Sequence, residues 1–272
     1  IKKFISRDYW EIHGTFLATD GSYSGRWFDE KFIKNRENVE QKAERVWEHE
    51  TAESIRIKCH GKTGIVSEVS KPAKETCPRL YDLTSLQRDA NGRFGFSAKM
   101  TLSLAQALYE RHKVLTYPRT DSRALSEDYI STVQDTLGEM KDSQYGIFAS
   151  KILESEWVKP SKRIFNNSKI SDHFAIIPTS LQPKKLNEAE QKLYDLVTKR
   201  FLAIFYPAAE FLVTTRVTRV ENEPFRTEGK VMVNPGWQSV YGKEVRANGT
   251  DKDSVLVAVK QNESVHAEEI EI

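Results

Sequence analysis

The sequence has little of the features that define several common protein classes. Its 272 residues contain no apolar run close to the roughly 20 residues of a membrane-spanning helix, so we predict no membrane segment. Only two cysteines occur, Cys59 and Cys77, and they lack the C-x-x-C spacing of a zinc ribbon, so we predict no metal site. Two plain thiols indicate a reducing compartment, and we expect a cytoplasmic location.

Net charge is also nearly absent, since 41 Lys and Arg stand against 39 Asp and Glu. This balance argues against wholesale binding of a polyanion. The distribution is uneven, however, because eight Lys or Arg and only four Asp or Glu lie between Arg79 and Arg123. A local basic excess is typical of a solvated surface, or of a surface that binds a phosphate-bearing partner.

Three regions differ in pattern. Residues 9–74 favour strands, with a helix predicted over 36–50 and strands over 54–60 and 63–70. The middle region is helical, and strand patterns return after Pro207, the last over 254–262. We therefore predict an α+β fold in which a discontinuous β-rich domain receives a mainly helical insertion. The predicted boundaries are 1–76 for the first β-rich part, 77–207 for the helical insertion and 208–272 for the second β-rich part.

The helical region contains clear start signals. Ser97 and Ser126 are predicted N-caps, each followed by apolar residues at helical spacing. Between Gln87 and Arg93 the polar residues indicate a turn joining two helices, although they also suit a binding surface.

The stretch "LTYPRTDS" (Leu115 to Ser122) suggests chemistry. Pro118 pushes Tyr117 out of the helical conformation. A phenol has a pKa of about 10 and attacks a phosphodiester only when the developing charge is stabilised. The planar fork of Arg119 suits phosphate oxygens. The alternative is that Tyr117 is a half-buried packing residue and that Thr120 and Ser122 cap the next turn.

A second candidate motif is "DHFAIIPT" (Asp172 to Thr179). A protonated imidazole at His173 can hold a phosphate, and a carboxylate can keep that imidazole in position. A histidine beside an apolar run can equally be structural.

Three motifs together resemble type IA DNA topoisomerases. "LYDLTSLQRDANGRFGFSAKMTLSLAQALYE", then "LTYPRTDS", then "DHFAIIPT" occur in the order found in that family, and the wording looks closest to the topoisomerase III branch. "RDYWEI" near the start resembles the family's entry into its β-rich arch domain. The resemblance covers nearly the whole chain.

The resemblance implies a bacterial, DNA-associated enzyme that cleaves one DNA strand, passes another and reseals the break without ATP. Tyr117 would form the 5′-phosphotyrosine link, Arg119 would bind the scissile phosphate, His173 would be a second charged partner, and Asp121 would be a supporting carboxylate. The helical insertion would be the gate and the β-rich part the arch. We further predict DNA contacts from Arg88, Arg93, Lys99, Thr120, Ser122 and Arg123.

The family's Toprim domain has no match in the sequence. That domain carries a D-x-D-x-E cluster that binds magnesium, whereas "DKDSV" at 251–255 has the D-x-D spacing without the glutamate and is predicted to be a turn. With Ile1 as the first residue, we expect a central fragment that holds no cofactor, whose full-length form uses Mg²⁺. Its expected partners are single-stranded DNA and the remaining domains of the same polypeptide, as a monomer. We expect the fragment alone to be inactive in relaxation.

Other classes fit less well. A tyrosine recombinase needs an H-x-x-R motif, and none of the six histidines is followed by arginine three residues later. A relaxase needs a His-hydrophobe-His motif, which is also missing. A non-catalytic module that binds single-stranded DNA or acts as a scaffold remains the alternative.

Overall fold

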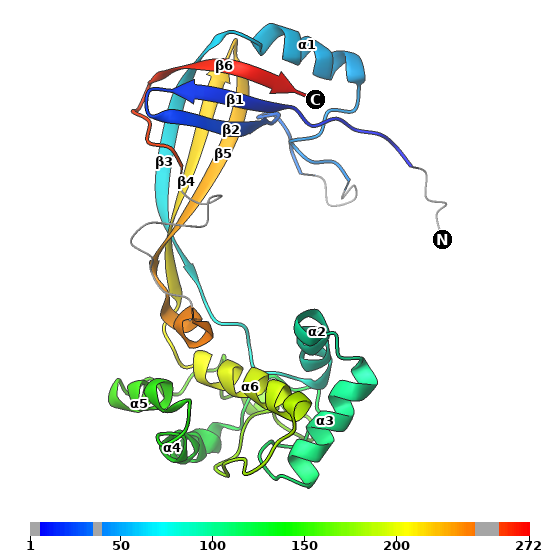
Figure 1. Cartoon of the computed structure of the whole chain (residues 1–272), viewed down its shortest axis with the longest axis vertical. Helices are drawn as coiled ribbons and strands as arrows, with labels where there is room; N and C mark the ends of the chain where they lie inside the picture. Colours follow the sequence, from blue (N-terminus) through cyan, green and yellow to red (C-terminus); the bar gives the residue numbers. More distant parts are fainter. Residues whose placement is uncertain (1–5, 35–39, 243–255) are drawn as a thin grey trace. The chain divides into compact units, whose positions relative to one another are not determined.

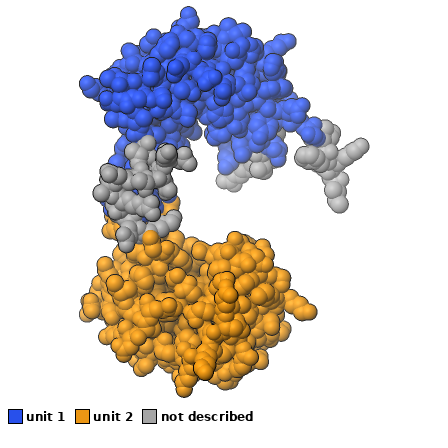
Figure 2. All heavy atoms as spheres, in the orientation of Figure 1, with its two compact units in different colours: residues 1–73, 211–233, 246–272 blue, residues 74–210, 234–245 orange. Residues whose placement is uncertain are grey.

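The computed structural model of the chain describes residues 6–34, 40–242 and 256–272 (Figure 1). It divides into two compact units (Figure 2). We call them the barrel unit, made of residues 1–73, 211–233 and 246–272, and the helical unit, made of residues 74–210 and 234–245. The helical unit therefore also takes in a short segment from the region that we predicted as β-rich. That segment contains the 3₁₀ helix η3 (Gly236–Tyr241).

The barrel unit is built on a closed sheet with the strand order β1-β2-β5-β4-β3-β6. Its strands are β1 (His13–Ala18), β2 (Gly21–Trp27), β3 (Thr63–Glu75), β4 (Ala209–Val220), β5 (Glu223–Asn234) and β6 (Ser264–Glu271). β1 pairs antiparallel with β2 and with β6, and β2 meets β5 at Arg26–Arg226 and Trp27–Phe225. The turn from β4 to β5 has positive φ at both Glu221 and Asn222, the conformation that tight hairpins require.

Alternation along β1 and β2 decides which side chains fill the barrel. Phe16 and Tyr23 point inward, and their ring centroids are 5.5 Å apart. Phe225 of β5 packs against Phe16 at 5.3 Å. Burying aromatic side chains of this size contributes about 1.5–3 kcal/mol each. Helix α1 (His49–Cys59) adds Ala52 and Ile55 to the same core.

Part of the sequence-based prediction for the barrel unit is wrong. The strand predicted over 54–60 is instead helical as far as Cys59, the last residue of α1, because Ala52, Ile55 and Cys59 are buried at helical spacing while Ile57 is 64% exposed. The helix predicted over 36–50 extends outside the described residues at 36–39. In the described part, Val46 pairs with Trp10 in an isolated bridge and helix begins only at His49.

The last predicted strand is also displaced. Residues 254 and 255 lie outside the described residues, as does "DKDSV", and residues 256–262 form no strand. The strand that closes the barrel is β6, which follows a turn.

In its described residues, the helical unit packs five α-helices around one core. They are α2 (Leu83–Phe94), α3 (Ala98–Glu110), α4 (Ile130–Glu139), α5 (Gly146–Glu154) and α6 (Glu188–Ala203). α6 lies within this core, since Leu193, Val197 and Phe201 are all fully buried. Two further 3₁₀ turns, η1 (Glu127–Tyr129) and η2 (Asn167–Lys169), lie in the connections.

Local caps explain where α2 and α3 begin and end. Asp82 and Ser85 form a capping box at the start of α2, and Gly95 ends it in the left-handed conformation. Ser97 caps α3 as predicted, accepting from the amide of Met100. The polar turn predicted at Gln87–Arg93 is wrong, because these residues lie on α2.

Ser126 precedes η1, but its side chain makes no cap hydrogen bond there.

Among residues 6–34, 40–242 and 256–272, none of the helices has both the length and the apolar character of a membrane span.

Candidate active site

The tyrosine and histidine motifs run side by side in the helical unit. Leu115 forms an isolated antiparallel bridge with Pro178. The amide of Thr116 donates to the carbonyl of Ile177 at 3.0 Å, and the amide of Ile177 donates to Thr116 Oγ1 at 3.0 Å. Two motifs about 55 residues apart in sequence are therefore held in register by backbone bonds.

Tyr117 lies between two other rings. Its ring centroid is 4.3 Å from that of His173 and 5.4 Å from that of Tyr109, which meets it edge to face. Tyr117 is half-buried, and His173 is exposed. The ring of Tyr117 is thus restricted by neighbours on two sides and stays partly open to solvent.

Arg119 is exposed and is positioned by α3. With the amide of Gln106 turned so that its oxygen faces the guanidinium, this oxygen accepts from Arg119 Nη2 at 2.9 Å and from Nε at 3.3 Å. Gln106 and Tyr109 lie three residues apart on α3, so one helix face contacts both the arginine and the tyrosine. The i, i+3 spacing places Gln106 and Tyr109 on one face of α3, but nothing in the sequence indicated that this face meets Tyr117 and Arg119.

Thr120 and Ser122 are buried and make hydrogen bonds within the protein. Thr120 Oγ1 donates to the carbonyl of His173 at 2.8 Å, and Ser122 Oγ donates to the carbonyl of Lys169 at 2.9 Å. Ser122 also donates its amide to Thr120 Oγ1. The two hydroxyls therefore position the histidine segment, and a contact from them to DNA stays a prediction.

Asp121 contacts the histidine segment through a serine. Its Oδ1 accepts from Ser171 Oγ at 3.0 Å, two residues before His173. Among the described residues, no hydrogen bond or ion pair joins Asp121 to the His173 ring. Any influence of Asp121 on His173 in this structure passes through the backbone between Ser171 and His173.

The other predicted DNA-binding cations differ in exposure. Arg88 and Arg93 lie exposed on α2, and Lys99 lies exposed in the first turn of α3. The Arg93 guanidinium is 5.7 Å from the centre of the Tyr241 ring. Arg123 is half-buried, and its Nε donates to the carbonyl of Leu80 at 3.0 Å.

We did not predict from the sequence a charged network that contacts the segment after His173. Arg200 of α6 is 6% exposed, donates to Asp89 Oδ2 at 3.0 Å, and lies 4.3 Å from the Tyr81 ring centre. Tyr81 donates its hydroxyl to the same carboxylate, and burial raises the pKa of this phenol. The amide of Ile176 donates to the carbonyl of Tyr81 in an isolated bridge, so the network supports the extended segment that follows His173.

The part of the chain that the structure describes contains no cluster of side chains arranged to bind a metal ion. No group of three or more His, Cys, Asp or Glu side chains is placed there to hold one. The residues present therefore do not fit the Mg²⁺ that the resemblance implies, and we derive no step through it.

Comparison with known proteins matches a DNA topoisomerase family model to residues 1–272. The chain belongs to this DNA topoisomerase family, and the resemblance inferred from its three motifs is confirmed.

Among similar proteins is DNA topoisomerase 3 of Bacillus subtilis, 40% identical over 258 residues that make up 93% of this chain and 34% of that protein. DNA topoisomerase 3 of Bacillus cereus is 46% identical over 206 residues, covering 75% of this chain and 27% of that protein. The chain thus spans about a third or less of the length of these relatives.

The fold has a solved counterpart. The structure of full-length topoisomerase I from Thermotoga maritima covers 98% of this chain with a TM-score of 0.62 and 19% identity, and the match spans 40% of that chain. At this identity the likeness shows the fold.

Proposed function

We propose that this chain carries the strand-cleaving tyrosine of a type IA DNA topoisomerase, with Tyr117 as the nucleophile. The main support is the contact between the rings of Tyr117 and His173, whose centroids are 4.3 Å apart, in a chain that belongs to the DNA topoisomerase family. Arg119 stands exposed two residues from Tyr117.

The proposed step is a transesterification. The phenol oxygen of Tyr117 attacks the phosphorus of one DNA phosphodiester and forms a P–O bond, while the bond from phosphorus to the 3′ oxygen breaks. The phenol proton leaves, the 3′ oxygen takes up a proton, and the 5′ phosphate stays on the tyrosine. Attack by the 3′ hydroxyl reverses each change and reseals the strand, so no ATP is consumed.

Arg119 and His173 supply the positive charge that this step needs. With the Gln106 amide so turned, its oxygen accepts from Nε and Nη2 of Arg119. Within the described residues no hydrogen bond engages Nη1, which can donate to a phosphate oxygen. A protonated His173 beside the phenol donates to a second phosphate oxygen. Together the two groups hold the phosphorus near the Tyr117 oxygen.

The finer assignments belong to the same proposal. Between cleavage and resealing a second strand passes, with the helical unit as the gate and the barrel unit as part of the arch. Because the chain spans 34% of the Bacillus subtilis relative, strand passage, the Mg²⁺ requirement and the monomeric state are proposed for a longer polypeptide that contains these residues. Single-stranded DNA is the proposed substrate, in the cytoplasm.

Covalent trapping tests the nucleophile. In a polypeptide as long as the Bacillus relatives, Tyr117→Phe should abolish the covalent adduct with a 3′-end-labelled single-stranded oligonucleotide, because phenylalanine has no attacking oxygen. Tyr109→Phe is the matched control, since it makes the same change on the neighbouring ring and should keep the adduct. An adduct that persists in Tyr117→Phe would refute the assignment. If the unmutated protein binds the oligonucleotide but forms no adduct, the result would favour the alternative of a non-catalytic DNA-binding module.

A further inference from the structure

A hollow on the helical unit lies beside the histidine segment. Its volume is about 410 Å³, and its lining combines three apolar or aromatic side chains with three polar ones. The lining residues are Ser126, Asp128, Tyr129, Asn167, Ile170 and Phe174.

The apolar part of the lining is a pair of rings. Tyr129 and Phe174 have centroids 4.8 Å apart and planes tilted by 45°, and Ile170 lies beside them. All three side chains are half-buried. Each therefore presents part of its surface to a ligand while the rest is held by the protein.

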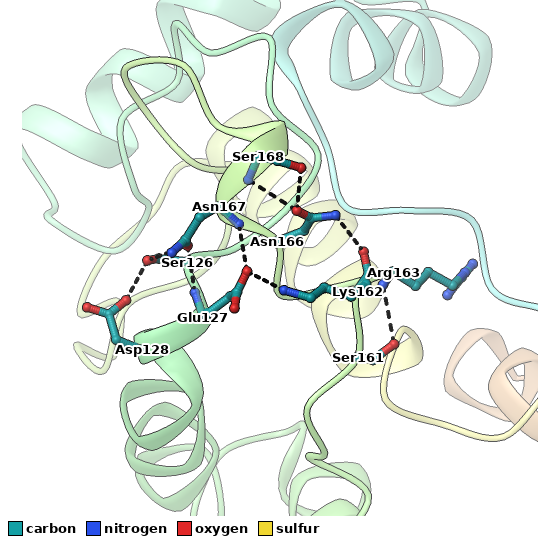
Figure 3. Close-up of polar contacts among 9 residues, drawn as sticks. All are labelled: Ser126, Glu127, Asp128, Ser161, Lys162, Arg163, Asn166, Asn167 and Ser168. Carbon is teal, nitrogen blue, oxygen red and sulfur yellow. Dashed lines mark hydrogen bonds and ion pairs between the residues drawn. The ribbon is translucent and has the colours of Figure 1, made fainter.

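The polar rim is fixed by a hydrogen-bond network (Figure 3). Asn167 Oδ1 accepts from the amide of Glu127 at 2.9 Å and from Ser126 Oγ at 3.1 Å. Ser126 Oγ also contacts Asp128 Oδ1. Lys162 in turn binds the Glu127 carboxylate at 2.6 Å. These contacts hold the connection around η2 against the start of η1.

The network leaves one donor and one acceptor for a ligand. Among the described residues, Asn167 Nδ2 and Asp128 Oδ2 have no hydrogen-bond partner. The rim therefore offers an amide N–H and a carboxylate oxygen next to the exposed faces of two rings. An aromatic surface with a donor and an acceptor at its edge suits a flat heterocycle with the complementary groups.

The hollow and the proposed cleavage site share one segment. Phe174 directly follows His173, so their Cα atoms are about 3.8 Å apart. Ile170 precedes Ser171, which binds Asp121 at 3.0 Å. The hollow therefore lies one residue along the same segment from the imidazole proposed to hold the scissile phosphate.

We propose that this hollow binds one unpaired nucleobase of the DNA strand held at Tyr117, an inference that rests on the proposed function. The base stacks on Phe174 and Tyr129, while Asp128 and Asn167 bond its edge. Every base has a flat face and an edge with both a donor and an acceptor, so the site tolerates sequence. A paired base cannot enter, because its edge is occupied and its faces are stacked.

The test compares two 12-nucleotide strands with the same phosphates, oligo(dT) and a fully abasic strand, by fluorescence anisotropy with the 272-residue chain. Stacking on one aromatic residue is worth about 1–3 kcal/mol, so Phe174→Ala should weaken oligo(dT) binding about fivefold or more. Abasic binding should stay unchanged. Asp128→Ala and Asn167→Ala change exposed residues and should show the same selective loss by a smaller factor. Asp135→Ala, an exposed carboxylate on α4, is the matched control and should bind both strands normally.

Unaltered oligo(dT) binding in both Phe174→Ala and Asp128→Ala would overturn the proposal, as would an equal loss on both strands. Since Phe174 also packs against the core, the exposed Asp128 and Asn167 variants decide the outcome if Phe174→Ala folds poorly. Failure of the chain to bind oligo(dT) at all would contradict both the proposed base site in the hollow and the proposed DNA-strand site at Tyr117. If covalent trapping does not depend on Tyr117 but the Phe174 and Asp128 losses remain, the proposed function fails and the base site stands.

Discussion

At the scale of single residues, the proposed chemistry depends on the groups that contact Tyr117. Its close ring contacts are Tyr109 and His173, and the nearby cation Arg119 is held by Gln106. Because a phenol is a weak nucleophile, the rate of cleavage should depend strongly on each positive charge near the phosphate.

Arg119→Ala should therefore lower cleavage more than it lowers DNA binding. Loss of a charge-assisted contact to a positioned phosphate costs about 1.5–3 kcal/mol, or roughly 10- to 150-fold in rate. Total binding to a long strand is shared among many phosphate contacts and should fall only a few-fold. Single-turnover adduct formation and anisotropy measure the two effects. Equal losses in both would assign Arg119 a general electrostatic role.

The two cysteines should be unreactive in the folded protein. Burial raises the pKa of the Cys59 thiol and that of the Cys77 thiol to about 12. From an ordinary value of 9.0, the thiolate fraction at pH 8 falls about a thousandfold, so Ellman's reagent should react slowly without denaturant and quickly with it. Fast reaction of either thiol in the native protein contradicts this prediction.

The same shift has a consequence for stability. Above about pH 9 the unfolded thiols lose their protons while the folded thiols keep theirs, so the contribution to stability declines as pH rises from about 9 toward 12. Below pH 9 both states hold the protons, and the thiols contribute no pH dependence there.

At the scale of elements, local sequence and structure agree at the starts of α3 and α6. Asn187 caps α6 by accepting from the amide of Glu190, and Glu190 returns a bond to the amide of Asn187. Glu190 is 3% exposed and pairs with Arg111 and His112, which ties this cap to the end of α3. The capping box was readable from the order of residues alone.

Asn187→Ala should destabilise the helical unit by about 0.5–2 kcal/mol, because the Glu190 amide loses its acceptor. Asn187→Ser supplies another acceptor and should retain most of the stability. Urea denaturation followed by circular dichroism measures the difference. Equal midpoints for the alanine variant and the unmutated chain would show that this cap contributes nothing measurable.

The errors at this scale have physical causes. The alternation in 54–60 resembles a strand, yet burial of Ala52, Ile55 and Cys59 against the barrel selects a helix. The polar residues of 87–93 resemble a turn, yet the Asp82 cap and the burial of Leu86 and Ala90 make them helical. Tertiary packing decided the first case, and a local cap together with burial decided the second.

At the scale of the whole molecule, the chain contains two compact units with separate cores. It matches no more than 34% of the length of the Bacillus subtilis relative. The described residues also lack a group of acidic side chains placed for a metal ion.

We therefore expect the purified 272-residue chain to leave negatively supercoiled plasmid unrelaxed, with or without Mg²⁺. Agarose gel electrophoresis measures the distribution of topoisomers, and the matched positive control is a polypeptide as long as the relatives. Relaxation by the 272-residue chain would overturn the expectation that it needs further domains.

The order of motifs in the sequence was sufficient to recognise the family, because "LTYPRTDS" and "DHFAIIPT" are specific in combination. The cap of α3 and the strands β3, β4 and β5 were likewise predicted from local residue order. Tertiary structure alone decided what surrounds Tyr117. Tyr109, Gln106 and His173 meet there because backbone bonds align two distant segments and α3 packs beside them. Contacts between residues far apart in the chain depend on packing, and no local pattern records them.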